Sequence, residues 1–323
     1  MRYVAIPHTT MRVSHICLGT GDMGTALSRH DSFAVLDAFV EAGGTFLDTA
    51  HVYGDWCPGE KHRSEKTIGQ WLKTTGQRDR MILATKGAHP DLATMQIPRL
   101  SPRKIIADLD DSLDCLGVEM IDLYWLHRDD PRRPVGEIVE TLNDQVRAGK
   151  IRSFGCSNWT PARIDEAQAY AAAHGLESFV ASQLQWSLAV PNPDSVAVDV
   201  AVMDDDAYAF YHEADMAVLA FSSQAKGFFT KARSGGLPAV KESVRRDYEN
   251  EQTMARLARA GELAARLGTS ITAIILAYIT SQPFVAVPIV GCQSLEQLRD
   301  SLADADAILS PGMLHYLVAG EGD

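Results

Sequence analysis

The sequence has few of the features that attach a protein to a membrane, to nucleic acid or to a disulfide framework. No apolar run approaches the ~18 residues of a membrane-spanning helix, and the longest is only Ile274–Ile279. Lysine and arginine (30) are fewer than aspartate and glutamate (42) and form no basic run, which argues against nucleic acid or an anionic membrane as partner. The five cysteines are scattered and form no CxxC pair, so we expect free thiols rather than disulfides or a zinc site.

The first residues, Met1–His8, also lack the long apolar segment of a secretory signal, and we expect a cytoplasmic protein. What is present is enough apolar sequence for a large core, since 46% of the 323 residues are hydrophobic and 22% are charged. This composition excludes a disordered chain. The length fits two domains, or one α/β barrel with long loops.

Short apolar strands alternate with amphipathic helices along the chain. Near-continuous apolar runs are typical of strands buried on both faces of a parallel sheet. Eight such strands are predicted, at His15–Gly19, Thr45–Thr49, Met81–Lys86, Met120–Leu126, Ile151–Cys156, Phe179–Gln183, Met216–Phe221 and Phe284–Ile289. Eight β/α units predict a (β/α)₈ barrel that occupies residues 1–323 as a single domain. The residues before His15 predict a β-hairpin that caps the barrel floor.

Start and stop signals place the helices between these strands. Cap residues, proline in the first turn and glycine at the end predict helices at Phe33–Ala42, Ser64–Leu72, Ile105–Leu116, Gly136–Ala148, Ala162–His174, Tyr248–Leu267 and Thr272–Thr280. The acidic run Asp204–Asp206 is interpreted as a helix N-terminus, where negative charge is favourable. The segment Lys231–Asp247 is predicted to be a polar loop.

A doubly wound open sheet is the competing architecture, and it normally carries GxGxxG after its first strand. Here the segment Gly19–Gly24 reads GTGDMG, with its third glycine early and no helix directly after it. The sequence therefore favours the barrel.

In such a barrel the active site lies at the C-terminal ends of the strands. Asp48, Tyr53, Lys86 and His127 come from three successive strand ends, so the fold brings them to one mouth. A tyrosine with an ordinary pKa near ~10 is a poor acid at neutral pH, and a neighbouring ammonium lowers that pKa. Aspartate can hold the ammonium charged, and histidine can orient a carbonyl oxygen. The four residues predict protonation of a carbonyl oxygen while a hydride reaches its carbon.

Other polar residues follow the second predicted strand, and these predict no metal site. His51, Asp55, Cys57 and His62 lie in one loop, but their spacing matches no zinc signature. We interpret this segment as a solvated loop that shapes the substrate pocket.

Four segments carry a resemblance to a known family: Phe46–Gly54 (FLDTAHVYG), Ile82–Lys86 (ILATK), Ile121–His127 (IDLYWLH) and Phe154–Asn158 (FGCSN). The chain resembles the aldo-keto reductase superfamily over essentially its whole length. The resemblance implies NAD(P)H-dependent reduction of an aldehyde or ketone by direct hydride transfer, without a metal. It implies Tyr53 as general acid/base, Lys86 and Asp48 as the pair that activates it, and His127 as the residue that orients the carbonyl.

The same resemblance implies a cofactor site. Around the nicotinamide it implies Asp48 with Gly19 and Thr20 at the base of the pocket, Ser157, Asn158 and Gln183 on the carboxamide, and Phe221 stacked on the ring. Along the pyrophosphate it implies Ser222, Ser223 and Gly227. Near the adenosine ribose it implies Gly291, Gln293 and Gln297. Where many members place Lys or Arg for the NADPH 2′-phosphate, this chain reads Cys292-Gln293-Ser294. On the family resemblance we expect NADP(H) rather than NAD(H), with Arg299 or Lys226 as substitute cations.

Polar and aromatic residues near the mouth predict a hydroxylated substrate from carbohydrate metabolism, such as a sugar or a sugar-derived ketone. We expect Trp56, Arg128, Asp129 and Trp186 to contact it.

Three alternatives stay open: a sugar or alcohol dehydrogenase that runs the same chemistry in reverse on a polyol, a cofactor-bound regulatory subunit that senses redox state, and a metal-dependent hydrolase. The sequence gives no indication of the oligomeric state.

Overall fold

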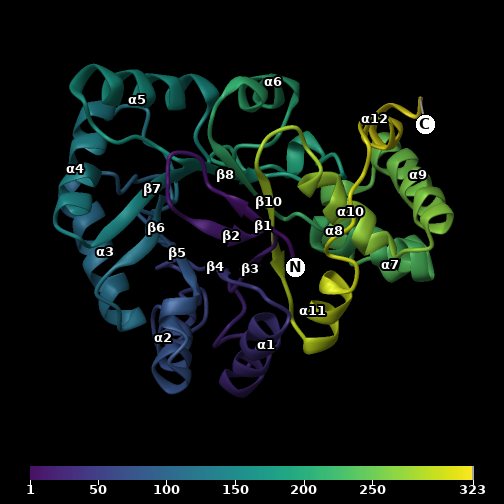
Figure 1. Cartoon of the computed structure of the whole chain (residues 1–323), viewed down its shortest axis with the longest axis horizontal. Helices are drawn as coiled ribbons and strands as arrows, with labels where there is room; N and C mark the ends of the chain where they lie inside the picture. Colours follow the sequence, from purple (N-terminus) through teal and green to yellow (C-terminus); the bar gives the residue numbers. More distant parts are fainter. Residues whose placement is uncertain (322–323) are drawn as a thin grey trace.

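The computed structural model describes residues 1–321, and its centre is a closed barrel of parallel strands (Figure 1). The strands follow one another around the barrel in chain order, and the last pairs with the first. They are β3 (Cys17–Gly19), β4 (Phe46–Asp48), β5 (Ile82–Gly87), β6 (Ile121–Leu126), β7 (Ile151–Ser157), β8 (Ala181–Gln185), β9 (Ala217–Phe221) and β10 (Ala286–Gly291). Each overlaps a predicted strand, so the (β/α)₈ barrel is confirmed.

Helices surround the strands, as Figure 1 shows. They are α1 (Arg29–Glu41), α2 (Arg63–Thr75), α3 (Pro102–Leu116), α4 (Val135–Arg147), α5 (Pro161–His174), α6 (Asp205–Glu213), α9 (Glu251–Leu267), α10 (Ile271–Thr280), α11 (Leu295–Leu302) and α12 (Pro311–Ala319). The cap signals act as the sequence indicates. The Thr160 hydroxyl caps α5 by accepting from the backbone N–H of Arg163, and Gly175 ends that helix in the left-handed region. Asp204 caps α6 in the same way.

The segment from 231 to 247 is not the polar loop that the sequence predicted. It contains most of α7 (Phe228–Gly235), a 3₁₀ turn η4 (Leu237–Ala239) and most of α8 (Glu242–Tyr248). The prediction was wrong because apolar residues are sparse in this segment. Of the few that it has, Ala232, Val240 and Val244 are buried, as are Phe228 and Phe229 just before it. Tertiary packing of a narrow apolar stripe therefore sets these helices.

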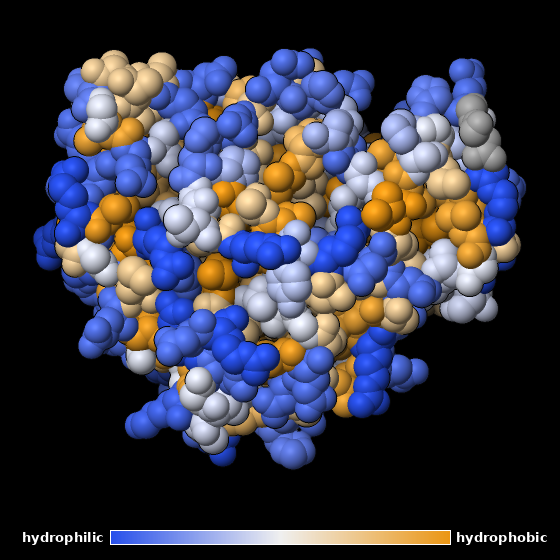
Figure 2. Space-filling model, in the orientation of Figure 1, coloured by the Kyte–Doolittle hydropathy of each residue, from blue (hydrophilic) through white to orange (hydrophobic). Residues whose placement is uncertain are grey.

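The predicted hairpin closes the floor of the barrel. Strands β1 (Tyr3–Ala5) and β2 (Arg12–Ser14) pair antiparallel and cross in front of the barrel strands in Figure 1. Ile6, Met11 and Val13 are buried in the same cluster as the interior side chains Phe46 and Trp125. Figure 2 shows this face, where charged side chains surround smaller apolar areas.

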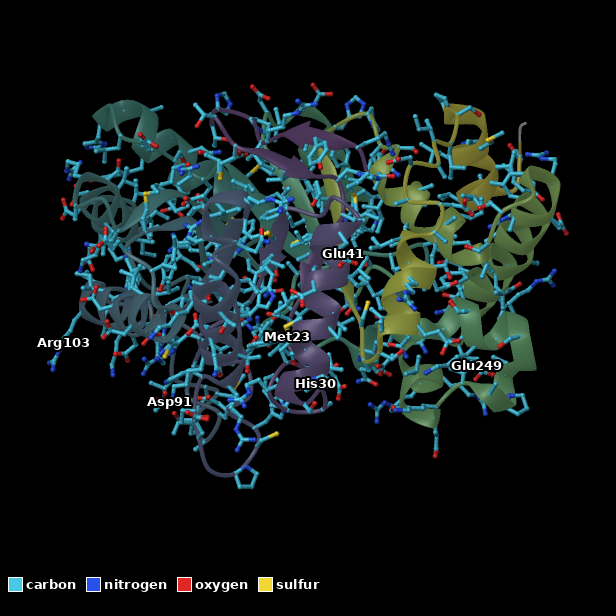
Figure 3. The ribbon with its side chains drawn as sticks, turned by 60° about the horizontal axis from the view of Figure 1, so that its bottom comes forward. Met23, His30, Glu41, Asp91, Arg103 and Glu249 are labelled. Carbon is cyan, nitrogen blue, oxygen red and sulfur yellow. The ribbon has the colours of Figure 1, made fainter. Side chains whose placement is uncertain are left out.

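The opposite end of the barrel is the mouth, where the strands end. In Figure 3, Met23 and Asp91, which lie in loops after β3 and β5, are far from the hairpin, whereas Glu41 at the end of α1 lies nearer to it. Polar residues that follow strands therefore gather at one end of the molecule.

Among residues 1–321, no single helix is long and apolar enough to cross a membrane. Only α9 and α10 taken together meet the length and composition test, and they are bent by 102° relative to each other.

Candidate active site

Lys86 is the centre of the predicted site. It lies at the end of β5, and only 1% of the residue is exposed. Its Nζ donates to Oδ2 of Asp48 at 2.5 Å, to the carbonyl oxygen of Thr49 at 2.8 Å and to the hydroxyl oxygen of Tyr53 at 3.3 Å. These bonds use all three ammonium donors. The Tyr53 hydroxyl accepts from Lys86, so its own proton is free to go to another acceptor.

The charge on Lys86 is held by its neighbours. Burial by itself lowers the pKa of a lysine, but the interactions with Asp48 and Tyr53 together outweigh this, and the pKa of Lys86 is raised overall. The other oxygen of Asp48, Oδ1, accepts from Nε2 of Gln183 at 3.0 Å. Asp48 is therefore bonded on both oxygens, and Lys86 faces Tyr53 as a cation.

His127 follows β6 and is the fourth residue of the predicted catalytic set. Burial, and then the nearby charge of Lys86, hold the pKa of His127 well below its usual range, so the ring is neutral at pH 7. Its ring lies edge-on to Tyr53, with centroids 6.0 Å apart, and to His89 at 4.6 Å. Its Nδ1 is buried and has no partner among the described residues, which leaves Nε2 to reach the mouth.

The backbone of His127 is fixed by its neighbours. Its N–H donates to the carbonyl oxygen of Gly87 at 2.9 Å. Its carbonyl oxygen accepts from Nδ2 of Asn158 at 3.1 Å and from Nη1 of Arg128 at 2.9 Å. Two neighbouring segments and the adjacent Arg128 therefore hold the backbone from which the histidine ring projects.

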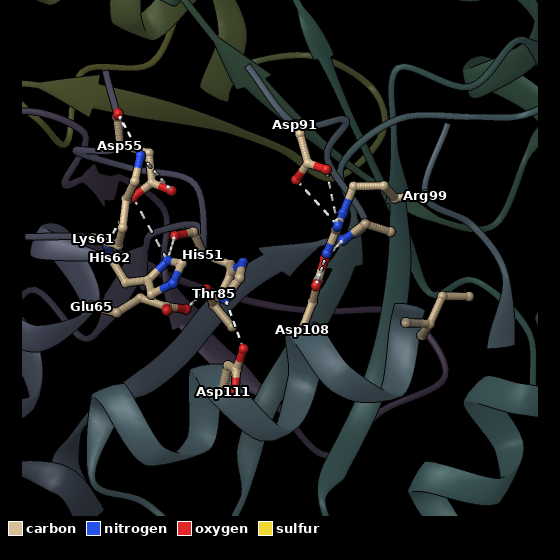
Figure 4. A network of polar contacts seen from close by, with 12 residues as sticks. His51, Asp55, Lys61, His62, Glu65, Thr85, Asp91, Arg99, Asp108 and Asp111 are labelled. Carbon is tan, nitrogen blue, oxygen red and sulfur yellow. Dashed lines mark hydrogen bonds and ion pairs between the residues drawn. The ribbon is translucent and has the colours of Figure 1, made fainter. Parts of the chain in front are cut away.

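The loop that carries Tyr53 is closed at its base by two histidines, as Figure 4 shows. The rings of His51 and His62 stack with centroids 3.8 Å apart, and Nδ1 of His62 donates to the carbonyl oxygen of His51 at 2.6 Å. The backbone N–H of His62 donates to Oδ1 of Asp55 at 2.8 Å. The sequence predicted a solvated loop here, and residues 58–61 and Trp56 are indeed exposed, whereas the base of the loop is packed through the His51–His62 stack. Spacing alone gives no signal for ring stacking.

The residues predicted for the carboxamide lie side by side. Ser157 and Gln183 are paired across β7 and β8, and Asn158 follows directly. Both N–H groups of the Asn158 amide donate within the protein, to His127 and to Ser157. Asn158 has φ of 63°, a left-handed conformation uncommon outside glycine. The Ser157 hydroxyl and the Gln183 amide oxygen are thus the groups best placed to bind a polar ligand.

Gly19 and Thr20 brace Asp48 from the neighbouring strand. The backbone N–H and the hydroxyl of Thr20 both donate to the carbonyl oxygen of Asp48, at 3.1 and 3.0 Å. A Cβ on Gly19 would come within 2.8 Å of the side chain of Ile289. The close packing of β3 against β10 therefore requires glycine at this position.

The loop after β9 has an unusual backbone. Phe221 ends the strand, half-buried, and four positions that follow have φ between 47° and 81°: Ser222, Ala225, Lys226 and Gly227. Left-handed backbone outside glycine is strained and is found at functional sites. The backbone N–H groups of Ala225 and Gly227 donate within the loop, to the carbonyl oxygens of Ser222 and Gln224. The Ser223 hydroxyl instead donates to the carbonyl oxygen of Ile289 at 2.6 Å. Lys226 pairs with Asp247 at 2.7 Å.

The loop between β10 and α11 has no cation at the predicted adenosine positions. Gly291 ends β10 and is exposed. The backbone N–H of Gln293 donates to Oε1 of Gln297 at 2.8 Å, and Nε2 of Gln293 donates to Asp22 at 3.0 Å. The backbone N–H of Gln297 bonds the Ser294 hydroxyl. The side chain of Gln293 is thus held by a carboxylate, Asp22, from the loop after β3.

Two of the four predicted substrate residues lie at the mouth. Trp56 is 52% exposed, and its ring lies edge-on to Tyr53 with centroids 6.0 Å apart. Nε of Arg128 pairs with Asp199 at 2.8 Å. An exposed aromatic ring therefore lies beside the tyrosine, and a partly exposed ion pair directly follows His127 in the chain.

The other two predicted substrate residues have structural partners. Asp129 pairs with Arg163 of α5 at 3.3 Å. Trp186 is only 4% exposed and packs in an aromatic cluster with Tyr208, Tyr278 and Phe284. The predicted substrate contact does not fit this position, because Trp186 packs against α6 and α10.

Behind the site lies a buried carboxyl, Glu65 of α2, that accepts from the Thr85 hydroxyl at 2.6 Å. Burial raises the pKa of Glu65 from 4.5 to about 7. Its contribution to stability is therefore fully present below pH ~4.5 and is lost as the pH rises through about 7.

We expect the Glu65→Gln variant to gain about 3 kcal/mol in free energy of unfolding, relative to the parent, between pH 5 and pH 8. Urea unfolding at the two pH values measures this. The exposed Glu41→Gln change serves as a matched control and should show no such gap. A constant difference between Glu65→Gln and the parent at both pH values would show that Glu65 stays in one protonation state.

Within the described part of the chain, no group of three or more His, Cys, Asp or Glu side chains could hold a metal ion. A sequence model of the aldo/keto reductase family matches residues 15–318. The chain belongs to the aldo/keto reductase family.

Relatives in sequence and in structure agree with this family. The chain is 29% identical to the uncharacterized oxidoreductase YrpG of Bacillus subtilis, over 98% of this chain and 95% of that protein. It is 28% identical to aryl-alcohol dehydrogenase [NADP(+)] of Phanerodontia chrysosporium, over 96% of this chain and 83% of the relative. The crystal structure of the thermostable aldo-keto reductase Tm1743 superposes with a TM-score of 0.74 at 22% identity, over 99% of both chains, and so shares the fold. As an aldo/keto reductase, the protein is an oxidoreductase.

Proposed function

We propose that this aldo/keto reductase uses NAD(P)H to reduce an aldehyde or ketone to the alcohol, with Tyr53 as general acid. The observation that carries the proposal is the hydrogen bond from Lys86 to the Tyr53 hydroxyl, because Lys86 is buried, charged and held by Asp48. This arrangement stabilises the tyrosinate that remains after the proton has left.

The residues act in a simple order. The neutral ring of His127 donates from Nε2 to the substrate carbonyl oxygen, since that oxygen can only accept, and Tyr53 donates to the same oxygen. A dihydronicotinamide held at Ser157 and Gln183 would supply the hydride that the carbonyl carbon needs. As negative charge builds on the oxygen, Tyr53 transfers its proton there, and Lys86 stabilises the resulting tyrosinate. In the reverse direction the tyrosinate serves as base.

The polar groups around this centre fit the cofactor. The Ser157 hydroxyl and Gln183 amide suit a carboxamide, and we expect the diphosphate at the strained loop after β9, where the family resemblance implies it. The buried free cysteines Cys17, Cys156 and Cys292 are in keeping with a reducing cytoplasmic setting.

The phosphate preference is the finer part of the proposal. The family resemblance and the printed name of the NADP(+)-dependent relative support NADP(H). Gln293, bonded to Asp22, offers no positive charge to a 2′-phosphate.

We expect Gln293→Arg to tighten NADPH binding about tenfold and to leave NADH binding unchanged, because an arginine–phosphate bond contributes about 1.5–3 kcal/mol. Fluorescence titration with both nucleotides measures this. Equal changes for the two nucleotides would place the 2′-phosphate elsewhere.

For the substrate we propose a hydroxylated carbonyl compound such as a sugar or sugar-derived ketone. The exposed ring of Trp56 beside Tyr53 supports this, since aromatic faces stack on sugar rings, and the Arg128–Asp199 pair offers polar contacts.

The test of the proposed function is a spectrophotometric screen at 340 nm across sugars, ketones and aldehydes with both nucleotides, with and without chelator. We expect turnover that chelator does not change. Stable binding of nucleotide with no turnover on any carbonyl would favour the regulatory subunit instead.

A further inference from the structure

His89, in the loop after β5, has no role in the chemistry described so far, yet its ring lies against the site. The centroid of this ring is 4.6 Å from that of His127, with the planes inclined by 63°. The ring of His127 in turn lies edge-on to Tyr53. Three rings thus border the place where a carbonyl would be held.

The loop that carries His89 is built to hold this position (Figure 4). Ala88, just before it, is buried with φ of 60°, and its backbone N–H donates to Oδ2 of Asp108 at 2.9 Å. Arg99 pairs with Asp108 and, at 3.2 Å, with Asp91 on the far side of the loop. A left-handed alanine is costly, so the surrounding bonds must enforce the turn that brings His89 over His127.

The hydrogen bonding of His89 fixes which ring nitrogen carries the proton. Nδ1 lies 2.7 Å from the carbonyl oxygen of Pro90, which can only accept, so Nδ1 is the donor. Burial, together with the charge of Arg128, holds the pKa of His89 below its usual value, and the ring is neutral. Nε2 therefore has a lone pair, and within residues 1–321 the hydrogen bond found for this ring is the one through Nδ1.

We propose that Nε2 of His89 accepts a hydrogen bond from a hydroxyl on the carbon next to the substrate carbonyl, so that the enzyme selects α-hydroxy aldehydes and ketones. This rests on the proposed function, because the carbonyl oxygen must first be held by Tyr53 and His127. A carbonyl held in this way would place its neighbouring carbon near the His127 ring, on which His89 packs. Open-chain sugars and their ketone derivatives carry a hydroxyl at this place.

A purely structural role for His89 makes a different prediction. If His89 only supported His127, replacing it would impair every carbonyl substrate alike. If His89 binds the hydroxyl, replacing His89 impairs only substrates that carry this hydroxyl, since a substrate without the hydroxyl cannot form the bond.

The experiment compares kcat/KM for glycolaldehyde and propanal, which differ only by a hydroxyl in place of a methyl group. His89→Phe keeps a ring against His127 and removes the acceptor. We expect it to lower the glycolaldehyde-to-propanal ratio by about 10- to 30-fold, the loss of one hydrogen bond to a buried group. His89→Gln restores an acceptor and should recover part of the ratio. The exposed His30→Gln variant is the control and should keep the parent ratio.

An equal fall for both aldehydes, or an unchanged ratio in His89→Phe, overturns the inference while the parent's turnover of propanal upholds the proposed function. Failure of the parent to oxidise either nucleotide with any carbonyl overturns the proposed function itself. A folded His89→Gln variant with the ratio of His89→Phe would also contradict the role of an acceptor at this position.

Discussion

Replacing Tyr53 by phenylalanine is expected to lower kcat/KM for carbonyl reduction by about 10³-fold, because no other group bonded to Lys86 can give a proton to the carbonyl oxygen. The change removes one oxygen atom at a half-buried position, so the fold and nucleotide binding should persist. Steady-state kinetics on the best substrate of the screen measures the loss.

Nucleotide titration and circular dichroism are the controls for this variant. A Tyr53→Phe protein that binds nucleotide as the parent does and keeps more than a tenth of the activity would contradict the assignment of Tyr53 as the acid. In that case the proton would have to come from His127 or from solvent.

Replacing Lys86 by methionine should affect both stability and activity. The change leaves the Asp48 carboxylate buried with only Gln183 as a side-chain donor. Removing one partner of a buried ion pair costs about 3–5 kcal/mol. We expect a loss of that size in the free energy of unfolding by urea at pH 7, together with loss of turnover.

The double variant Asp48→Asn/Lys86→Met separates these two effects. It carries no unpaired buried charge and should regain most of the lost stability, but it should stay inactive because nothing stabilises the tyrosinate. Recovery of turnover along with stability would show that Lys86 serves the fold and not the chemistry.

The barrel and the members of its central cluster could be predicted from the sequence for a physical reason. Parallel strands buried on both faces read as apolar runs, and their C-terminal ends meet at one mouth. Asp48, Lys86 and His127 stand at or just after such ends, so their convergence follows from topology. The structure brings these three and Tyr53 together as expected.

The features that the sequence did not predict depend on contacts between residues that are far apart in the chain or in loops that fold back. Trp186 directly follows β8, but the direction of its side chain is set by α6 and α10, which local sequence does not reveal. The stacked pair of His51 and His62 and the contact of His89 with His127 require loops to fold back on themselves. Likewise, the segment from 231 to 247 is polar apart from a narrow apolar stripe, so its sequence did not predict α7 and α8.

The most direct test of direct hydride transfer assisted by Tyr53 follows deuterium from the nucleotide to the product. The enzyme is given propanal and NADPH or NADH dideuterated at C4 of the nicotinamide, and the alcohol is analysed by mass spectrometry. Our account predicts one deuterium on the carbinol carbon with the parent enzyme and a rate lower by about 10³-fold with Tyr53→Phe. Alcohol that carries no deuterium, or equal rates for the two proteins, would contradict it.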